Sequence, residues 1–230
     1  MWWSCFTWYE KGPYHIWEKE TAAEKKECKK DLAARNAARY EKDLADWEAV
    51  QVIHRLHATR GQTGVRAQFR HDEDHGAFVR KDGKGGIDWY RYQVKIIKER
   101  LLPFARTLLK KYGFTRVQED NAGPHASHYN VDFWKTVEVL CLDWCANSPD
   151  LNAIEPTWFW MKRETTKNGP LKSNDELKKA WIKCWEDMPQ EKIQAWIERI
   201  PIHIQEVIKC NGNNLYKEGR RNGQEKRRIH

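Results

Sequence analysis

The sequence predicts an α/β fold, in which helices pack on a β-sheet. Two patterns lead to this prediction: the first 17 residues have the composition of a β-hairpin, and helix and strand patterns alternate in the order β-α-β-α after residue 90. The chain has 230 residues, which fits one large domain or two small ones and allows a substantial core.

The N-terminal segment has the features of two short strands. Residues 1–9 are apolar and aromatic, residues 10–13 have the turn-forming composition Glu-Lys-Gly-Pro, and residues 14–17 are apolar again. The apolar start is short and lacks a basic region, so we do not interpret it as a signal peptide. We therefore assign residues 1–17 to the folded sheet.

A helical rod is predicted after the hairpin. Residues 18–58 are rich in Ala, Glu, Lys and Arg and contain no Gly or Pro, which predicts one long helix or a pair. Their apolar residues form a narrow stripe, so we expect a solvated helix that protrudes from the fold. Residues 59–88 are rich in Gly and charge, which predicts a mobile loop. The His-Asp-Glu-Asp-His run at 71–75 contains metal-binding residue types, although its Gly and Lys neighbours favour a solvated loop.

The elements after residue 90 are predicted from apolar spacing and from Gly and Pro residues. Residues 92–112 predict an amphipathic helix, interrupted at Pro103 and ended by Gly113. The other predicted elements, in order, are a strand at 114–119, a helix at 127–135, a strand at 137–142, a helix at 153–167, two or three helices within 173–210 with Pro201 dividing the last pair, and a basic disordered tail at 217–230.

The composition favours nucleic acid as the partner. Lys and Arg number 41 against 33 Asp and Glu, so the formal net charge is +8. No apolar stretch approaches the length of a membrane helix, and 13 Trp residues argue against general disorder. We therefore expect an intracellular protein that binds nucleic acid and no membrane.

The cysteines leave a zinc site as a minor alternative. The chain has six Cys residues scattered along its length, unlike the dense framework of a small secreted domain. Cys141 and Cys145 are four residues apart, and His125 and His128 lie upstream of them. No second pair follows at zinc-finger spacing, so ordinary thiols are the preferred interpretation.

Two acidic residues stand at positions suited to chemistry. Asp120 follows the strand predicted at 114–119, and the rim of a sheet is where α/β proteins bind ligands. Glu155 falls in the first turn of a predicted helix. Two carboxylates brought together would repel one another unless a divalent cation lay between them, and Mg²⁺ or Mn²⁺ favours such oxygen ligands. Each residue also has a structural interpretation: Asp120 as a turn former, Glu155 as an acid at a helix N-terminus, and Asp150 as a cap.

The segments around these acids resemble the catalytic region of mariner-type transposases, a branch of the DDE transposases. That family has a strand ending in Asp-Asn-Ala-Pro-x-His, followed by the motif Trp-x-Ala-x-Ser-Pro-Asp-Leu-Asn-Pro-Ile-Glu. The matching residues here are Asp120, Asn121, Ala122 and His125, then Trp144, Ala146, Ser148 to Asn152, Ile154 and Glu155. The resemblance covers about residues 1–17 and 89–216, which leaves 18–88 as a helical insertion with a flexible loop.

The resemblance implies an RNase H-like α/β fold that carries out metal-dependent DNA cleavage and strand transfer with a two-metal Mg²⁺ or Mn²⁺ site. It implies that Asp120 and Glu155 are catalytic metal ligands. It also implies DNA as partner, a possible homodimer, and a nuclear location in a eukaryote. The residues expected to lie behind the metal or to face DNA are Asn121, His125 and Asn152, and those expected to contact DNA phosphates are Lys162, Arg163, Arg220 and Arg221.

One departure from the family affects the expected activity. The first catalytic Asp of the family lies on a strand upstream of the segment that residues 1–6 resemble, so no residue of this sequence corresponds to it. We therefore expect an N-terminally truncated RNase H-like domain that lacks its first strand and is inactive by itself. The alternatives are a non-catalytic nucleic-acid-binding or assembly module, and a relic that makes no stable protein.

Overall fold

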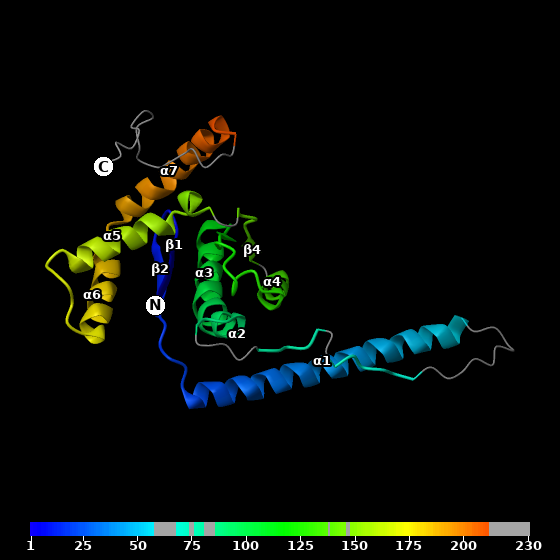
Figure 1. Ribbon diagram of the computed structural model, residues 1–230. Helices are drawn as coiled ribbons and strands as arrows, with labels where there is room; N and C mark the ends of the chain where they lie inside the picture. The colour runs from blue at the N-terminus through cyan, green and yellow to red at the C-terminus, as the bar shows by residue number, and fades with distance from the viewer. Residues whose placement is uncertain (58–67, 74–75, 81–85, 138, 146–147, 212–230) are drawn as a thin grey trace, which may run out of the picture. The chain divides into compact units, whose positions relative to one another are not determined.

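The computed structural model describes residues 1–57, 68–73, 76–80, 86–137, 139–145 and 148–211. The chain divides into two compact units, which we treat separately. Unit 1 consists of residues 1–17 and 91–230, and unit 2 consists of residues 18–90. Figure 1 labels their helices and strands.

The predicted hairpin is present at the start of unit 1. Strand β1 (Trp2–Phe6) pairs antiparallel with β2 (Lys11–Ile16). The register is irregular between Ser4 and Phe6, which places a bulge at Cys5. A Cβ atom added at Gly12 would lie 2.6 Å from the Cys5 sulfur and 2.7 Å from the Phe104 ring, so only glycine fits against this bulge.

The helix predicted over 92–112 is present, but the predicted interruption at Pro103 is wrong. The helical segment consists of α2 (Trp89–Tyr92), a π-helical stretch η1 (Gln93–Leu101) and α3 (Leu102–Tyr112). Pro103 falls in the first turn of α3, directly after the wider π winding, where the hydrogen-bond register already changes and a missing N–H is tolerated. Gly113 ends the helix with a φ of 79°, as predicted.

The predicted single α/β sheet is reduced to two separate two-stranded sheets within the described residues, and the structure is mostly helical. Strand β3 (Arg116–Val117) pairs in parallel with β4 (Leu140–Cys141), with α4 (His128–Lys135) between them in the chain. Both strands are shorter than predicted because little of either segment is buried. Val117 and Val139 are buried, whereas Phe114 and Leu140 are 70% and 64% exposed.

Three helices complete unit 1, after a short 3₁₀ turn η2 (Pro149–Leu151). They are α5 (Ile154–Thr166), α6 (Asn174–Asp187) and α7 (Gln190–Lys209). The predicted division at Pro201 is wrong, because α7 continues through it. Pro201 is exposed, so water can replace the hydrogen bond that the proline removes.

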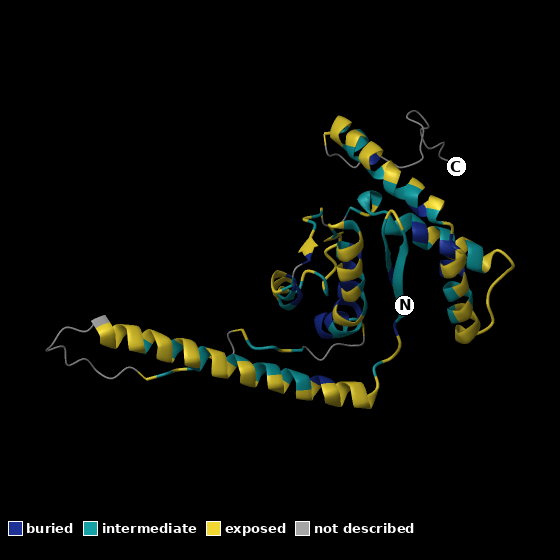
Figure 2. Ribbon diagram, turned by 180° about the vertical axis from the view of Figure 1, so that it is seen from behind, coloured by how far each residue is buried: buried dark blue, intermediate teal, exposed yellow. Residues whose placement is uncertain are grey.

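The core of unit 1 includes the place where these helices meet the hairpin. Lys11 of β2 donates hydrogen bonds from Nζ to the carbonyl oxygens of Trp185 (2.9 Å) and Met188 (2.8 Å), and also to that of Glu186. Trp2 stacks on Tyr14 with ring centres 4.7 Å apart. Figure 2 shows the buried positions of the helices in dark blue. The buried cluster contains Met161, Cys184, Trp185, Met188 and Ile193, with Trp2, Tyr14, Trp158, Trp160, Trp181 and Trp196 packed around it.

Unit 2 is built on one long helix, α1 (Ala22–His57), as the composition predicted. Thr21 and Glu24 cap its start reciprocally: each side chain accepts the other residue's backbone N–H, at 3.2 and 2.8 Å. The segment predicted to be a mobile loop contacts α1 where the structure describes it, and its mobility stays a prediction. Asn36 of α1 makes two hydrogen bonds with the backbone of Phe78, and Arg39 donates to the carbonyl oxygen of Asp72.

The His-Asp-Glu-Asp-His run is only partly described, since residues 74–75 lie outside the described ranges. His71 contacts α1: its Nδ1 lies 3.2 Å from Asp43, and its Nε2 lies 2.9 Å from the Arg39 guanidinium. The His71 side chain is therefore held by Arg39 and Asp43, and the choice between a solvated loop and a metal site stays a prediction.

Candidate functional site

Asp120 lies just after β3, in a turn that its own side chain stabilises. Its Oδ1 accepts a hydrogen bond of 3.0 Å from the Ala122 N–H and lies 2.7 Å from Nδ1 of His125. The neighbouring Asn121 adopts a left-handed φ of 59°. The hydrogen bond with His125 is the main reason why the pKa of Asp120 falls to about 2, against the opposing effect of partial burial. This carboxylate is therefore ionised at neutral pH.

Glu155 lies in the first turn of α5. Its N–H donates to the carbonyl oxygen of Asn152 at 3.1 Å, which continues the chain from η2 into the helix. Burial raises the pKa of Glu155, and the negative charge of Asp120 raises it further. The two acids that the sequence placed on separate segments thus interact electrostatically in the folded chain.

Two asparagines of the motif hold loops near these acids. Asn121 donates from Nδ2 to the carbonyl oxygen of Trp144 at 2.7 Å, which joins the segment after β3 to the segment after β4. Asn152 accepts a hydrogen bond of 3.3 Å from the Ile154 N–H at the start of α5. Both side chains therefore position the backbone that carries the acids.

Glu119 is a residue that the sequence reasoning missed. Its carboxylate accepts hydrogen bonds from the Tyr92 hydroxyl (2.5 Å) and from the Trp134 indole (3.1 Å), and burial raises its pKa. The Tyr92 ring lies 4.2 Å from the His125 ring, so this group supports the His125–Asp120 contact from behind. Side chains alternate between the two sides of an extended segment, so an outward Asp120 next to Glu119 is the signal that could have identified Glu119 as the inward residue.

The exposed face of α5 carries the predicted basic residues. Lys162 and Arg163 are exposed, seven and eight residues after Glu155, which is about two helical turns. Phe159 lies between Glu155 and Lys162 along α5 and is 63% exposed. Thr157 and Met161 are buried on the other side of the helix. The predicted contacts Arg220 and Arg221 lie outside the described residues.

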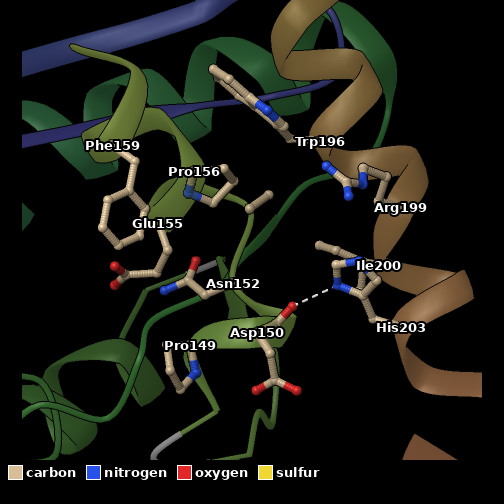
Figure 3. A pocket seen from close by; sticks show the side chains of 11 residues that line it. Pro149, Asp150, Asn152, Glu155, Pro156, Phe159, Trp196, Arg199, Ile200 and His203 are labelled. Atoms are coloured by element: carbon tan, nitrogen blue, oxygen red, sulfur yellow. Dashed lines mark hydrogen bonds between the residues drawn. The ribbon is translucent and has the colours of Figure 1, made fainter. Parts of the chain in front are cut away.

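A pocket of about 300 Å³ opens beside Glu155. Figure 3 shows Asn152, Glu155 and Phe159 on one wall and α7 on the opposite wall. The Nδ1–H of His203 donates to the carbonyl oxygen of Asp150 at 2.9 Å and so connects α7 with η2. Sequence reasoning missed the α7 residues, although their spacing places Trp196, Arg199, Ile200 and His203 on one helical face.

Few side chains that could bind a metal ion lie close together in the part of the chain that the structure describes. No group of three or more His, Cys, Asp or Glu residues there lies close enough together to hold a metal ion. The pair Asp120 and Glu155 offers carboxylate oxygens, which suit Mg²⁺ or Mn²⁺. Cys141 and Cys145 of the zinc alternative are exposed, and His125 is engaged with Asp120. No helix among the described residues is long and apolar enough to cross a membrane.

The chain resembles curated transposases in sequence, although no family model matches it. It is 31% identical to the Tc3 transposase of Caenorhabditis elegans over 101 residues, 44% of this chain and 31% of that protein. It is 31% identical to the Tcb1 transposase of Caenorhabditis briggsae over 130 residues and to the Tc1 transposase of C. elegans over 127 residues. These matches cover 56% and 55% of this chain, and 45% of each relative. The chain thus spans less than half the length of the curated relatives it matches.

Solved structures of the Mos1 mariner transposase also match. The Mos1 catalytic domain matches with 20% identity and a TM-score of 0.48, over 59% of this chain and 66% of that chain. The Mos1 paired-end complex with Mn matches with 20% identity and a TM-score of 0.47, over 57% of this chain and 38% of the Mos1 chain. Over about half of its length, the chain is homologous to transposases of the Tc1/mariner type.

Proposed function

We propose that this chain forms part of an RNase H-like, DNA-cleaving site of the Tc1/mariner type, in which Asp120 and Glu155 hold Mg²⁺ or Mn²⁺. The observation that carries the proposal is the place of two carboxylates in the motif segments: Asp120 follows β3, and Glu155 lies in the first turn of α5. A divalent cation between them would offset the repulsion that now raises the pKa of Glu155. Structures of the Mos1 transposase catalytic domain have been solved with Raltegravir and Mn and with Raltegravir and Mg, in keeping with this choice of metal.

The residues around the pair have supporting roles in this proposal. A bound pair of such ions activates a water molecule or a 3′-hydroxyl group and stabilises the leaving oxygen of a phosphodiester. His125 lowers the pKa of Asp120 and would fix the orientation of its carboxylate, and Tyr92, which Glu119 holds, packs on the His125 ring. Asn121 and Asn152 fix the two backbone segments that bear the acids.

We propose that DNA lies along the exposed face of α5. Lys162 and Arg163 follow Glu155 on that face, and both would contact phosphates without reading sequence. Arg220 and Arg221 would add further phosphate contacts from the C-terminal segment. The net charge of +8 supports such binding, and the proposal extends to a nuclear location in a eukaryote and to a homodimer on DNA.

We also propose that Asp120 and Glu155 by themselves do not sustain cleavage. Two carboxylates leave each ion of a two-metal site with few protein ligands, and no third carboxylate joins them among the described residues. The chain would then bind metal and DNA, with turnover requiring a further ligand.

Metal binding is tested by titrating Mn²⁺ into the purified chain and following thermal unfolding. A ligand that binds only the folded state raises the unfolding midpoint, so we expect a rise for the wild type. Asp120→Asn and Glu155→Gln should each weaken Mn²⁺ binding by about tenfold or more. Glu191→Gln, an exposed acid on α7, serves as the control and should respond like the wild type. An equal response of all four proteins would overturn the assignment of the metal ligands.

Cleavage is tested separately, with duplex DNA and Mn²⁺. We expect no product above the background of metal alone, because the two carboxylates form only part of the site. Nicking by the wild-type chain that disappears in Asp120→Ala would show that the described acids suffice. In that case the proposal of inactivity fails, while the assignment of the metal ligands stands.

A further inference from the structure

The pocket beside Glu155 has the shape and lining of a site for one flat aromatic group. Its volume of about 300 Å³ lies at the lower end of the range for small-molecule pockets, roughly 300–1,000 Å³. Most of its lining surface is apolar, and Figure 3 shows Phe159 on one wall and Trp196 on the other side. A site of this size accommodates a single ring system and excludes a peptide helix.

The Phe159 ring is available to such a group. It is 63% exposed, although a phenylalanine gains most of its stabilising free energy from burial. The neighbouring helical positions Thr157 and Met161 are fully buried, so α5 packs well and leaves this one ring on its open face. An exposed aromatic ring beside a pocket is the feature on which bases of single-stranded nucleic acid stack.

The charges around the pocket favour a nucleotide over a neutral ligand. Arg199 of α7 lines the pocket, and Lys162 and Arg163 follow Phe159 along α5. These cations suit phosphates on either side of a base, while the Asn152 amide lies at the pocket wall as a polar group for the base edge (Figure 3). His203 holds η2 against α7 and thereby fixes the distance between the two walls.

We propose that this pocket binds the base of one unpaired nucleotide of a DNA strand. The base stacks on Phe159, with Trp196 on the opposite wall, and Arg199 contacts its phosphate. An unpaired base is favoured, because both faces of a base inside a duplex are covered by its neighbours and its edge is paired, whereas an unpaired base can enter the pocket. The proposal rests on the proposed function, since Glu155 at the pocket rim would place this nucleotide next to the phosphodiester that the carboxylate site engages.

The test compares a short duplex that has a single-stranded 3′ overhang with the same duplex blunt-ended, in buffer with EDTA. The overhang carries 2-aminopurine, whose fluorescence falls when the base stacks on an aromatic ring. We expect the wild type to bind the overhang DNA about tenfold more tightly than the blunt DNA and to quench the probe. Phe159→Ala should lose both effects while its affinity for blunt DNA stays unchanged.

Three further variants distinguish stacking on the Phe159 ring from simple apolar contact and from a general effect of removing an exposed phenylalanine. Phe159→Tyr keeps the ring and should retain quenching, whereas Phe159→Leu keeps apolar bulk and should lose it. Phe114→Ala removes an equally exposed phenylalanine, 70% exposed, from another segment and should behave like the wild type. Equal wild-type affinity for overhang and blunt DNA, or quenching retained by Phe159→Ala, overturns the proposal.

The outcome is distinguishable from a failure of the metal site. Mn²⁺ stabilisation that depends on Asp120 and Glu155, without any preference for the overhang, would leave the proposed function intact and remove the base pocket. A preference for the overhang DNA that depends on Phe159, in a chain whose stability does not respond to Mn²⁺, would support the base pocket and remove the proposed metal site.

Discussion

Asp120 and Glu155 carry the same chemical group, yet their surroundings shift their pKa values in opposite directions. The hydrogen bond with His125 lowers the pKa of Asp120 to about 2, whereas burial and the charge of Asp120 raise that of Glu155. The folded chain therefore favours the ionised form of Asp120 and disfavours that of Glu155 relative to the free side chains. A divalent cation bound by both carboxylates would lower the pKa of Glu155 again.

Another single residue, His15 of β2, gives the protein a pH dependence far from the acids. Burial and the nearby Arg100 charge lower its pKa from 6.5 to about 4, so the folded chain holds the imidazole neutral. The unfolded chain binds a proton at higher pH than the folded chain does. The stability that the neutral ring contributes is therefore complete above pH 6.5 and is lost as the pH falls toward 4.

His15→Gln should make the stability of the folded chain depend less on pH between pH 7 and pH 4. We expect the urea midpoint of the wild type to fall more between pH 7 and pH 4 than that of the variant, since the variant has no imidazole to protonate. His54→Gln removes an exposed histidine of α1 and should keep the wild-type slope. Parallel profiles of all three proteins would contradict the role of His15.

At the scale of elements, the hairpin depends on a close approach between β1 and β2. Gly12 leaves no room for a Cβ atom, because the Cys5 sulfur, the Cys5 carbonyl oxygen and the Phe104 ring all lie within 2.9 Å of its position. The bulge at Cys5 and the absence of a side chain at Gly12 therefore belong together, and they place the hairpin against α3.

Gly12→Ala should destabilise the chain by about 1–3 kcal/mol, the usual effect of overpacking a filled site. Urea unfolding monitored by tryptophan fluorescence measures the change. Gly123→Ala is the matched control: a Cβ atom there meets nothing within 4 Å, so its unfolding free energy should stay near that of the wild type. A loss at Gly123 as large as that at Gly12 would show that the space around Gly12 is not the cause.

Prediction from sequence succeeded for features that depend on neighbouring residues in the chain. It failed for features that depend on what an element packs against in the fold. The rod at 18–58, the cap at Gly113 and the positions of both acids followed from composition, from one glycine and from a specific motif. The breaks expected at Pro103 and Pro201 did not occur, because the effect of a missing N–H depends on the winding and on solvent around it. The face of α7 that meets Glu155 was not predictable, since periodicity shows that a face exists but not what it contacts.

At the scale of the whole molecule, the excess of basic residues should govern DNA affinity through salt. We expect the logarithm of the association constant for duplex DNA to fall linearly with the logarithm of salt concentration. Lys162→Ala and Arg163→Ala should each reduce that slope by about one, equally for unrelated DNA sequences, because we propose that both residues contact phosphates. Lys179→Ala and Lys183→Ala on α6 are equally exposed controls that should leave the slope unchanged. Equal effects of both pairs would remove α5 as the DNA-binding face.

The contacts of Lys11 have a consequence for the order of folding. Its Nζ binds carbonyl oxygens at the end of α6, and Lys11 and Trp185 are 174 residues apart in the chain. A contact with such a long loop forms slowly, because the chain between must first be brought together. The hairpin can pack on α3 as soon as that helix has been made, whereas the contacts of Lys11 form only after α6 and the start of α7 have followed. The two sides of the hairpin thus reach their final contacts at different stages of synthesis.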